Sequence, residues 1–174
     1  MLNYIVGDLF KLLPYETPVP KFIPHIVNNA FGFGSGFVVP LMTKWPETRV
    51  QYMAQPIQVL GHTQFVKVKE AELPRYQIDG VEYKRFEYDN IWVAHMCAQN
   101  NTISASNPKP IKYAALAECM KQVAKACAAK RGEIWAPMFG SIRAGGNWSF
   151  IEELIDEIWG DISVTICKFD ENEK

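Results

Sequence analysis

The hydrophobic and polar positions along the chain predict short strands that alternate with helices. Runs of apolar or alternating residues end at polar residues or glycine, and the run at 91–97 is apolar almost throughout, which is typical of a strand buried on both faces. Strands are expected at residues 2–6, 22–28, 64–68, 91–97, 134–138 and 162–168. The segment 75–88 is expected to form a hairpin with its turn at Asp79 and Gly80.

Two long helices are predicted in the second half of the chain. Apolar residues recur at helical spacing over 110–130, and the residues at 130–132 predict a basic last turn followed by a glycine stop. Ser149 and Glu152 have the spacing of a capping box, in which each side chain bonds a backbone N–H at the start of a helix. Gly160 is expected to end that second helix. Its buried stripe is expected to consist of Ile151, Leu154, Ile155 and Ile158.

This order of elements predicts an α/β protein with one sheet covered by helices on both faces. The length of 174 residues fits a single domain over 1–174, with a frayed polar tail at 170–174. After the first strand, the link that contains Pro14, Pro18 and Pro20 is expected to be extended, because proline disfavours helix at these spacings.

Composition and charge narrow the class of partner. The chain has 18 Lys and Arg against 19 Asp and Glu, and this balance disfavours direct nucleic-acid binding, although backbone N–H groups can still bind a small anion. No signal-peptide pattern and no run of about 18 apolar residues is present, which predicts a cytoplasmic protein that does not contact a membrane. The four cysteines and three histidines match no zinc spacing, so we expect buried thiols and neither a metal nor another cofactor.

Two glycine-bearing loops each lie between a predicted strand and a predicted helix. The first, at 32–36, leads into an apolar stretch at 37–45, where Pro40 fits a helix only within the first turn. The second spans 139–147. Glycines beside a helix start let the backbone approach an oxyanion and direct N–H groups toward it, although a tight turn needs the same residues. The first loop matches neither the Walker A pattern nor Gly-x-Gly-x-x-Gly.

Taken in order along the chain, these and neighbouring motifs resemble those of macro domains. The motifs are at 7–9, 25–29, 33–37, 96–100, 137–141 and 145–148. The most similar branch contains ADP-ribose 1''-phosphate phosphatases, terminal ADP-ribose glycohydrolases and DNA de-ADP-ribosylating antitoxins. The resemblance implies a three-layer α/β/α macro-domain fold with a central mixed sheet. It also implies that the chain binds ADP-ribose, ADP-ribose 1''-phosphate or an ADP-ribosylated macromolecule.

The resemblance assigns ligand contacts to several of these motifs and to one residue near the end of the chain. Asp8, with the backbone of Leu9, would accept from the adenine amino group, and Phe169 would stack on adenine; an ordinary turn aspartate and a plain terminal aromatic are the alternatives. The first loop would wrap the distal ribose and one phosphate through Gly34, Ser35, Gly36 and Phe37. The second would wrap the diphosphate through Pro137, Gly140, Ser141, Ile142 and Arg143.

The chain departs from the family pattern at positions that bear on chemistry. Ile142 resists the positive φ that a family glycine allows, and Arg143 either adds a bidentate phosphate contact or is a solvated loop residue. The lysine and aspartate that the glycohydrolases use align with Gln99 and Ala144, which can neither form a Schiff base nor act as a base. The covalent mechanism is therefore not expected.

The resemblance leaves two main functions open. In the first, Asn28 and Asn29 hold ribose hydroxyls and a water near the bond to be hydrolysed, and His25 is the titratable group near the loop. A structural histidine bonded to the backbone is the alternative role of His25. In the second, the chain is a binding module that recognises ADP-ribose without turnover. A protein that keeps only the fold, for a structural or nucleic-acid role, is a third possibility.

Overall fold

The computed structural model describes residues 2–68, 76–83, 90–141 and 144–169, and its main feature is a six-stranded mixed sheet. The strands of this sheet are β1 (Leu2–Val6), β2 (Lys21–Asn28), β3 (Thr63–Val68), β6 (Ile91–Gln99), β7 (Glu133–Pro137) and β8 (Val164–Lys168). Their order is β1-β8-β7-β2-β6-β3, and all neighbours are parallel except β3, which pairs antiparallel with β6. The six predicted strands are therefore confirmed, with ends that differ by two residues at most.

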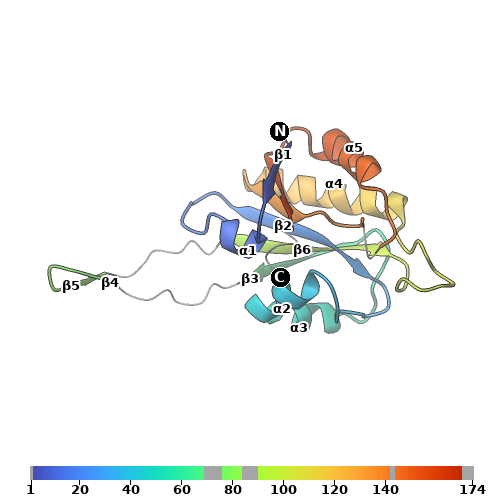
Figure 1. Ribbon diagram of the computed structural model, residues 1–174, viewed down its shortest axis with the longest axis horizontal. Helices are drawn as coiled ribbons and strands as arrows, with labels where there is room; N and C mark the ends of the chain where they lie inside the picture. The colour runs from blue at the N-terminus through green and yellow to red at the C-terminus, as the bar shows by residue number, and fades with distance from the viewer. Residues whose placement is uncertain (1, 69–75, 84–89, 142–143, 170–174) are drawn as a thin grey trace.

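Helices cover both faces of the sheet, so that the molecule has three layers (Figure 1). The helices α4 (Tyr113–Ala129) and α5 (Trp148–Trp159) pack on one face, and α1 (Leu9–Leu12), α2 (Val38–Lys44) and α3 (Glu47–Met53) pack on the other. The strand β6, next to the edge strand β3, is buried along both faces, because Met96 contacts the first layer and Val93 and Cys97 contact the second. The predicted three-layer α/β/α fold with a mixed central sheet is confirmed.

The helices α1 and α3 were not predicted from the sequence. Only four residues form α1, which is too short for a periodic apolar stripe, and Asp8 starts it by accepting from the backbone N–H of Phe10 at 2.9 Å. The proline-rich link that follows is nonhelical, as predicted, but it consists of turns and bends and is not extended. Pro46 precedes α3 and has helical φ and ψ, so a proline that interrupts the apolar pattern after Trp45 in fact starts a second short helix.

The end of α4 differs from the prediction. The helix ends at Ala129 without a basic residue in its last turn, and the left-handed residue is Arg131, with φ 52°, rather than Gly132. Gly132 is needed for another reason, because a Cβ there would lie 2.8 Å from the carbonyl oxygen of Pro20. Its N–H still bonds the carbonyl of Cys127 at 2.9 Å and so closes the helix.

The predicted capping box of α5 is wrong. The helix begins at Trp148, and Asn147 is the N-cap, whose side-chain oxygen accepts from the N–H of Phe150. Glu152 does not bond back to the helix start but accepts a hydrogen bond from the hydroxyl of Tyr4 on β1. A pair of residues with the correct spacing was thus outcompeted by a cap two residues earlier.

The predicted hairpin is present as β4 (Tyr76–Ile78) and β5 (Val81–Tyr83), which pair antiparallel. Asp79 and Gly80 both have positive φ, 52° and 79°, as a type I′ turn requires. The outer residues of the predicted hairpin, and the predicted tail at 170–174, lie outside the described residues. Within the described part of the chain, no helix is long and apolar enough to cross a membrane.

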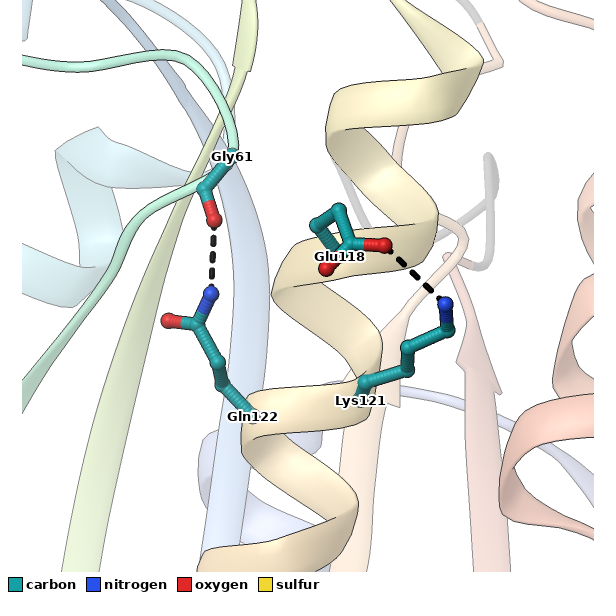
Figure 2. Close-up of polar contacts among 4 residues, drawn as sticks. All are labelled: Gly61, Glu118, Lys121 and Gln122. Carbon is teal, nitrogen blue, oxygen red and sulfur yellow. Dashed lines mark hydrogen bonds and ion pairs between the residues drawn. The ribbon is translucent and has the colours of Figure 1, made fainter.

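One side chain of α4 fixes the turn that leads into β3. Gln122 donates to the carbonyl oxygen of Gly61 at 2.6 Å (Figure 2). It also accepts from the N–H of Thr63 at 2.8 Å. Its helix neighbour Lys121 forms only an exposed ion pair with Glu118 at 3.0 Å. The buried edge of α4 therefore connects two layers, whereas the solvent-facing pair contributes little.

Candidate functional site

The carboxyl ends of the parallel strands meet at one edge of the sheet, and both glycine loops lie there. Because β7, β2 and β6 are neighbours, the loops 138–147, 29–37 and 100–112 that follow them are adjacent. The strands β1 and β8 end at the same edge, where Asp8 and Phe169 follow them. The predicted ligand residues of the described chain are thereby brought to one edge, as expected for a sheet of this type.

Asn28 organises the first glycine loop. Its side-chain oxygen accepts from the N–H groups of Ala30 and Gly32, both at 3.0 Å, and its side-chain nitrogen donates to the carbonyl of Gly32 at 2.9 Å. The hydroxyl of Tyr52 donates to the carbonyl oxygen of Asn28 at 2.7 Å. The buried Asn28 amide is therefore occupied by the start of the loop 29–37.

The loops expose backbone N–H groups that the protein itself does not use. Gly36 has φ 80°, which turns the chain before α2, and Pro40 lies in the first turn of that helix as predicted. A Cβ on Gly34 would meet nothing within 4 Å, so this stretch borders open space. Among the described residues of the two loops, the N–H groups without a hydrogen bond include those of Gly34, Gly36, Phe37, Gly140, Ser141 and Gly145.

Glycines in the second loop are required by close packing. Gly140 and Gly145 have positive φ, 79° and 69°, and a Cβ on Gly145 would lie 2.4 Å from the carbonyl oxygen of Pro108. A Cβ on Gly146 would lie 2.4 Å from the carbonyl oxygen of Gly140, to which the Gly146 N–H donates at 2.8 Å. The bond from Gly146 to Gly140 thus closes the loop, and a side chain at Gly145 or Gly146 would clash with backbone.

Other predicted residues of the second loop are only partly defined. Pro137 ends β7, and the hydroxyl of Ser141 donates to the carbonyl oxygen of Met138 at 3.2 Å. Ile142 and Arg143 lie outside the described residues, so the predictions for their backbone and phosphate contact stay predictions.

Asn29 is held by the loop after β6. Its side-chain nitrogen donates to the side-chain oxygen of Asn100 at 2.9 Å, and its side-chain oxygen accepts from the N–H of Asn101 at 2.7 Å. Its own backbone N–H donates to the carbonyl of Gln99 at 3.1 Å. Unlike Asn28, Asn29 is partly exposed, and it follows β2 at the edge of the sheet where the loops meet.

His25 lies beneath the first loop and not at its surface. It is 2% exposed, and its Nε2 lies 2.6 Å from Nδ1 of His95, whose Nε2 lies 2.9 Å from the carbonyl oxygen of Thr48. The carbonyl can only accept, so His95 donates from Nε2, and its Nδ1 accepts from His25. Burial lowers the pKa of His95 to about 4 and the pKa of His25 well below its usual value. Both rings are neutral at pH 7.

Aromatic contacts connect this histidine to the first loop and to α1. His25 packs against Phe37 of the first loop, with ring centroids 5.5 Å apart, and Phe37 stacks on Phe10 of α1 at the same distance. Asp8 accepts from Phe10 through one side-chain oxygen, while the N–H of Leu9 makes no hydrogen bond within the described chain. Phe169 is 70% exposed just after β8. The two predicted adenine contacts thus lie at the ends of neighbouring strands.

No ligand contact was predicted for the loop after β6, although Asn100 ends one of the motifs that resemble the family. Asn100, Asn101 and Asn107 bond to Asn29 or to each other, and the sequence signal for Asn101 was its place beside Asn100 directly after a strand. Gln99 donates to the carbonyl of Asn101 at 3.1 Å, and Ala144 is buried. Within the residues that the structure describes, no group of His, Cys, Asp and Glu side chains comes together to hold a metal.

Comparison with known proteins shows to which family a chain with this fold and these loops is similar. No protein-family model and no curated protein matches the chain. Solved structures do: a Bacteroides thetaiotaomicron protein of unknown function is 31% identical with a TM-score of 0.75, over 97% of this chain and 98% of that one. A macrodomain protein from Streptomyces coelicolor is 26% identical with a TM-score of 0.69, over 98% and 99% of the two chains. The chain belongs to the macrodomain family.

A further neighbour of this macrodomain was solved with a ligand. The Thermosipho africanus DarTG structure in complex with ADP-ribose has a TM-score of 0.66 and 13% identity, and the match covers 99% of this macrodomain and 43% of that chain. At this identity the likeness concerns the fold alone. The predicted family and fold of the macrodomain are confirmed, whereas the predicted roles of its individual site residues stay predictions.

Proposed function

We propose that this macrodomain binds ADP-ribose between its two glycine loops. The observation that carries the proposal is the set of unbonded N–H groups in the loops after the neighbouring strands β2 and β7. Converging backbone N–H groups suit a diphosphate, since they bind oxyanions without requiring a net positive charge. The complex of the Thermosipho neighbour with ADP-ribose supports this choice of ligand.

The positions of the strand ends suggest the direction of the ligand. Adenine would lie near Asp8 and Phe169, the diphosphate would lie between the loops, and the distal ribose would reach Asn29. The macrodomain would take free ADP-ribose, ADP-ribose 1''-phosphate or ADP-ribose on a macromolecule in the same orientation. The predicted contacts of Ser35, Gly36 and Ser141 belong to the diphosphate part of this proposal.

A charge substitution on the first loop tests the binding site. Gly34→Glu adds a carboxylate at a position where a Cβ meets no protein atom within 4 Å, so the fold should be kept while the ligand phosphates are repelled. Gly34→Gln is the neutral control of equal size. By titration calorimetry we expect the Glu variant to lose about tenfold more affinity for ADP-ribose than the Gln variant. Absence of ADP-ribose binding by the wild-type protein would refute the proposed function.

Hydrolysis of an ADP-ribose derivative is the catalytic form of this proposal. Asn29 is the predicted catalytic residue that is partly exposed and held in place, and it would orient the ribose and a water. The burial of His25 and its bond to His95 favour the alternative structural role for that residue. A chain that binds without turnover is the second candidate function, and the burial of the one titratable candidate favours it.

Incubation with substrates separates these two functions. The purified protein is mixed with ADP-ribose 1''-phosphate and, separately, with ADP-ribosylated protein and nucleic acid, and released phosphate or ADP-ribose is measured. Release that Asn29→Ala abolishes supports hydrolysis. Preserved ADP-ribose binding without release from any substrate supports the binding module.

A further inference from the structure

The loop after β6 contains an amide network whose centre is Asn101. Asn101 has φ 61°, a left-handed conformation that asparagine tolerates better than other residues with a Cβ. In this conformation its N–H points to the side-chain oxygen of Asn29 at 2.7 Å. The side-chain oxygen of Asn101 accepts from the N–H of Thr102 at 2.9 Å, which supports the same turn. The orientation of Asn29 thus depends on an unusual backbone conformation in another loop.

Asn107 fixes this turn from the other side of the loop. Its side-chain nitrogen donates to the carbonyl oxygens of Asn100 at 2.9 Å and Thr102 at 3.0 Å, the residues on either side of Asn101. Its backbone N–H also bonds the carbonyl of Ser104 at 3.1 Å. The network ends at the partly exposed Asn29, where both atoms of the side-chain amide are engaged.

We propose that Asn101 and Asn107 are positioning residues that fix the Asn29 side chain against the distal ribose of ADP-ribose. The inference rests on the proposed function, because it takes the ribose end of the ligand to meet Asn29. Engaging both ends of its amide prevents rotation of Asn29 and leaves the remaining N–H and lone pair in fixed directions. A group fixed before binding loses little entropy when the ligand arrives.

A double-mutant cycle tests this proposal, with titration calorimetry against ADP-ribose and against ADP, which lacks the distal ribose. Asn29→Ala and Asn107→Ala should each weaken ADP-ribose binding about tenfold and ADP binding less than about twofold. The double variant should bind like Asn29→Ala alone, because Asn107 acts through Asn29. Ser106→Ala is the control in the same loop, and it should bind like wild type. Among the described residues, the Ser106 hydroxyl hydrogen-bonds only that of Ser104, at 3.2 Å.

A second pair of variants tests the backbone conformation directly. Asn101→Gly keeps the N–H and adopts positive φ freely, whereas Asn101→Val strongly resists that conformation. We expect the Gly variant to keep ADP-ribose affinity within about threefold and the Val variant to lose about tenfold, with ADP affinity unchanged in both. Additive losses in the cycle, equal losses for ADP, or equal affinity of the Gly and Val variants would overturn the proposal. If the wild-type protein binds neither nucleotide, the proposed function itself fails.

Discussion

The buried histidine pair should make the stability of the macrodomain depend on acid. His95 has a pKa of about 4 in the folded protein, and its neighbour His25 is lowered in the same direction, mainly through burial. An unfolded histidine has a pKa near 6.5, so below that pH the unfolded chain takes up protons that the folded chain does not. The folded state is therefore fully favoured above about pH 6.5 and loses stability as the pH falls toward 4.

The size of this effect follows from the pKa of His95. Between pH 7 and pH 5 the unfolded residue binds a proton and the folded residue does not, over the roughly 1.5 pH units below its unfolded pKa. At about 1.4 kcal/mol for each pH unit, His95 alone therefore lowers the free energy of unfolding by about 2 kcal/mol. His25 adds to the loss in the same direction, by an amount that depends on its coupling to His95. A loss of this size is a large part of the stability of an ordinary domain.

Urea unfolding at pH 7 and pH 5 measures the loss, and the variant His25→Gln/His95→Gln is the control, because it keeps every other titratable group. We expect the wild-type free energy of unfolding to fall by at least about 2 kcal/mol more than that of the variant between the two pH values. The ring proton resonances of both histidines provide a second measurement, which does not depend on the stability of the variant. Equal pH dependence of the two proteins, or a ring that titrates between pH 6 and 7 in the folded state, would refute the reasoning.

Three further predictions concern stability and accessibility. Gln122→Leu should lower the free energy of unfolding in urea by about 1–3 kcal/mol, because two backbone groups lose their partner. Lys121→Ala should lower it by less than about 1 kcal/mol, because its ion pair is exposed (Figure 2). Similar losses for the two variants would contradict this difference in their roles. Gly146→Ala should lower the melting temperature by several degrees through its clash, whereas Gly34→Ala should leave it unchanged; a tolerated Gly146→Ala would show that the loop is not closed as described. A thiol reagent should modify no cysteine of the folded protein and all of them in denaturant, because all are buried. They are Cys97, Cys119, Cys127 and Cys167. Fast labelling of the native protein would contradict this burial.

The sheet and the glycine loops could be predicted from the sequence because their signals are local. Continuous apolar runs identify strands such as β6, and the glycine run at 32–36 identifies a turn before a helix. The predicted cap at Ser149 failed because a local spacing pattern does not reveal that Glu152 meets Tyr4, which lies at the other end of the chain. Such competition between a local and a distant partner is decided only by the packed structure.

The same limit applied to the candidate site. The sequence placed His25 and Asn28 near the first loop, but both are engaged by residues distant in sequence, His95 and Tyr52. Burial and partners decide whether a polar side chain can reach a ligand, and neither is visible in a short motif. Asn101 was missed for a related reason, since its importance comes from a backbone angle.

The stack of Phe10 on Phe37 has a consequence for how the edge of the sheet moves. Because one ring belongs to the helix capped by Asp8 and the other to the first glycine loop, displacement of either segment must shift or unstack the second. We expect the two segments to fluctuate together, so that a nucleotide bound to one segment would also reduce the motion of the other. Replacing either phenylalanine with leucine should then make the amide hydrogen-exchange rates of the two segments independent of each other.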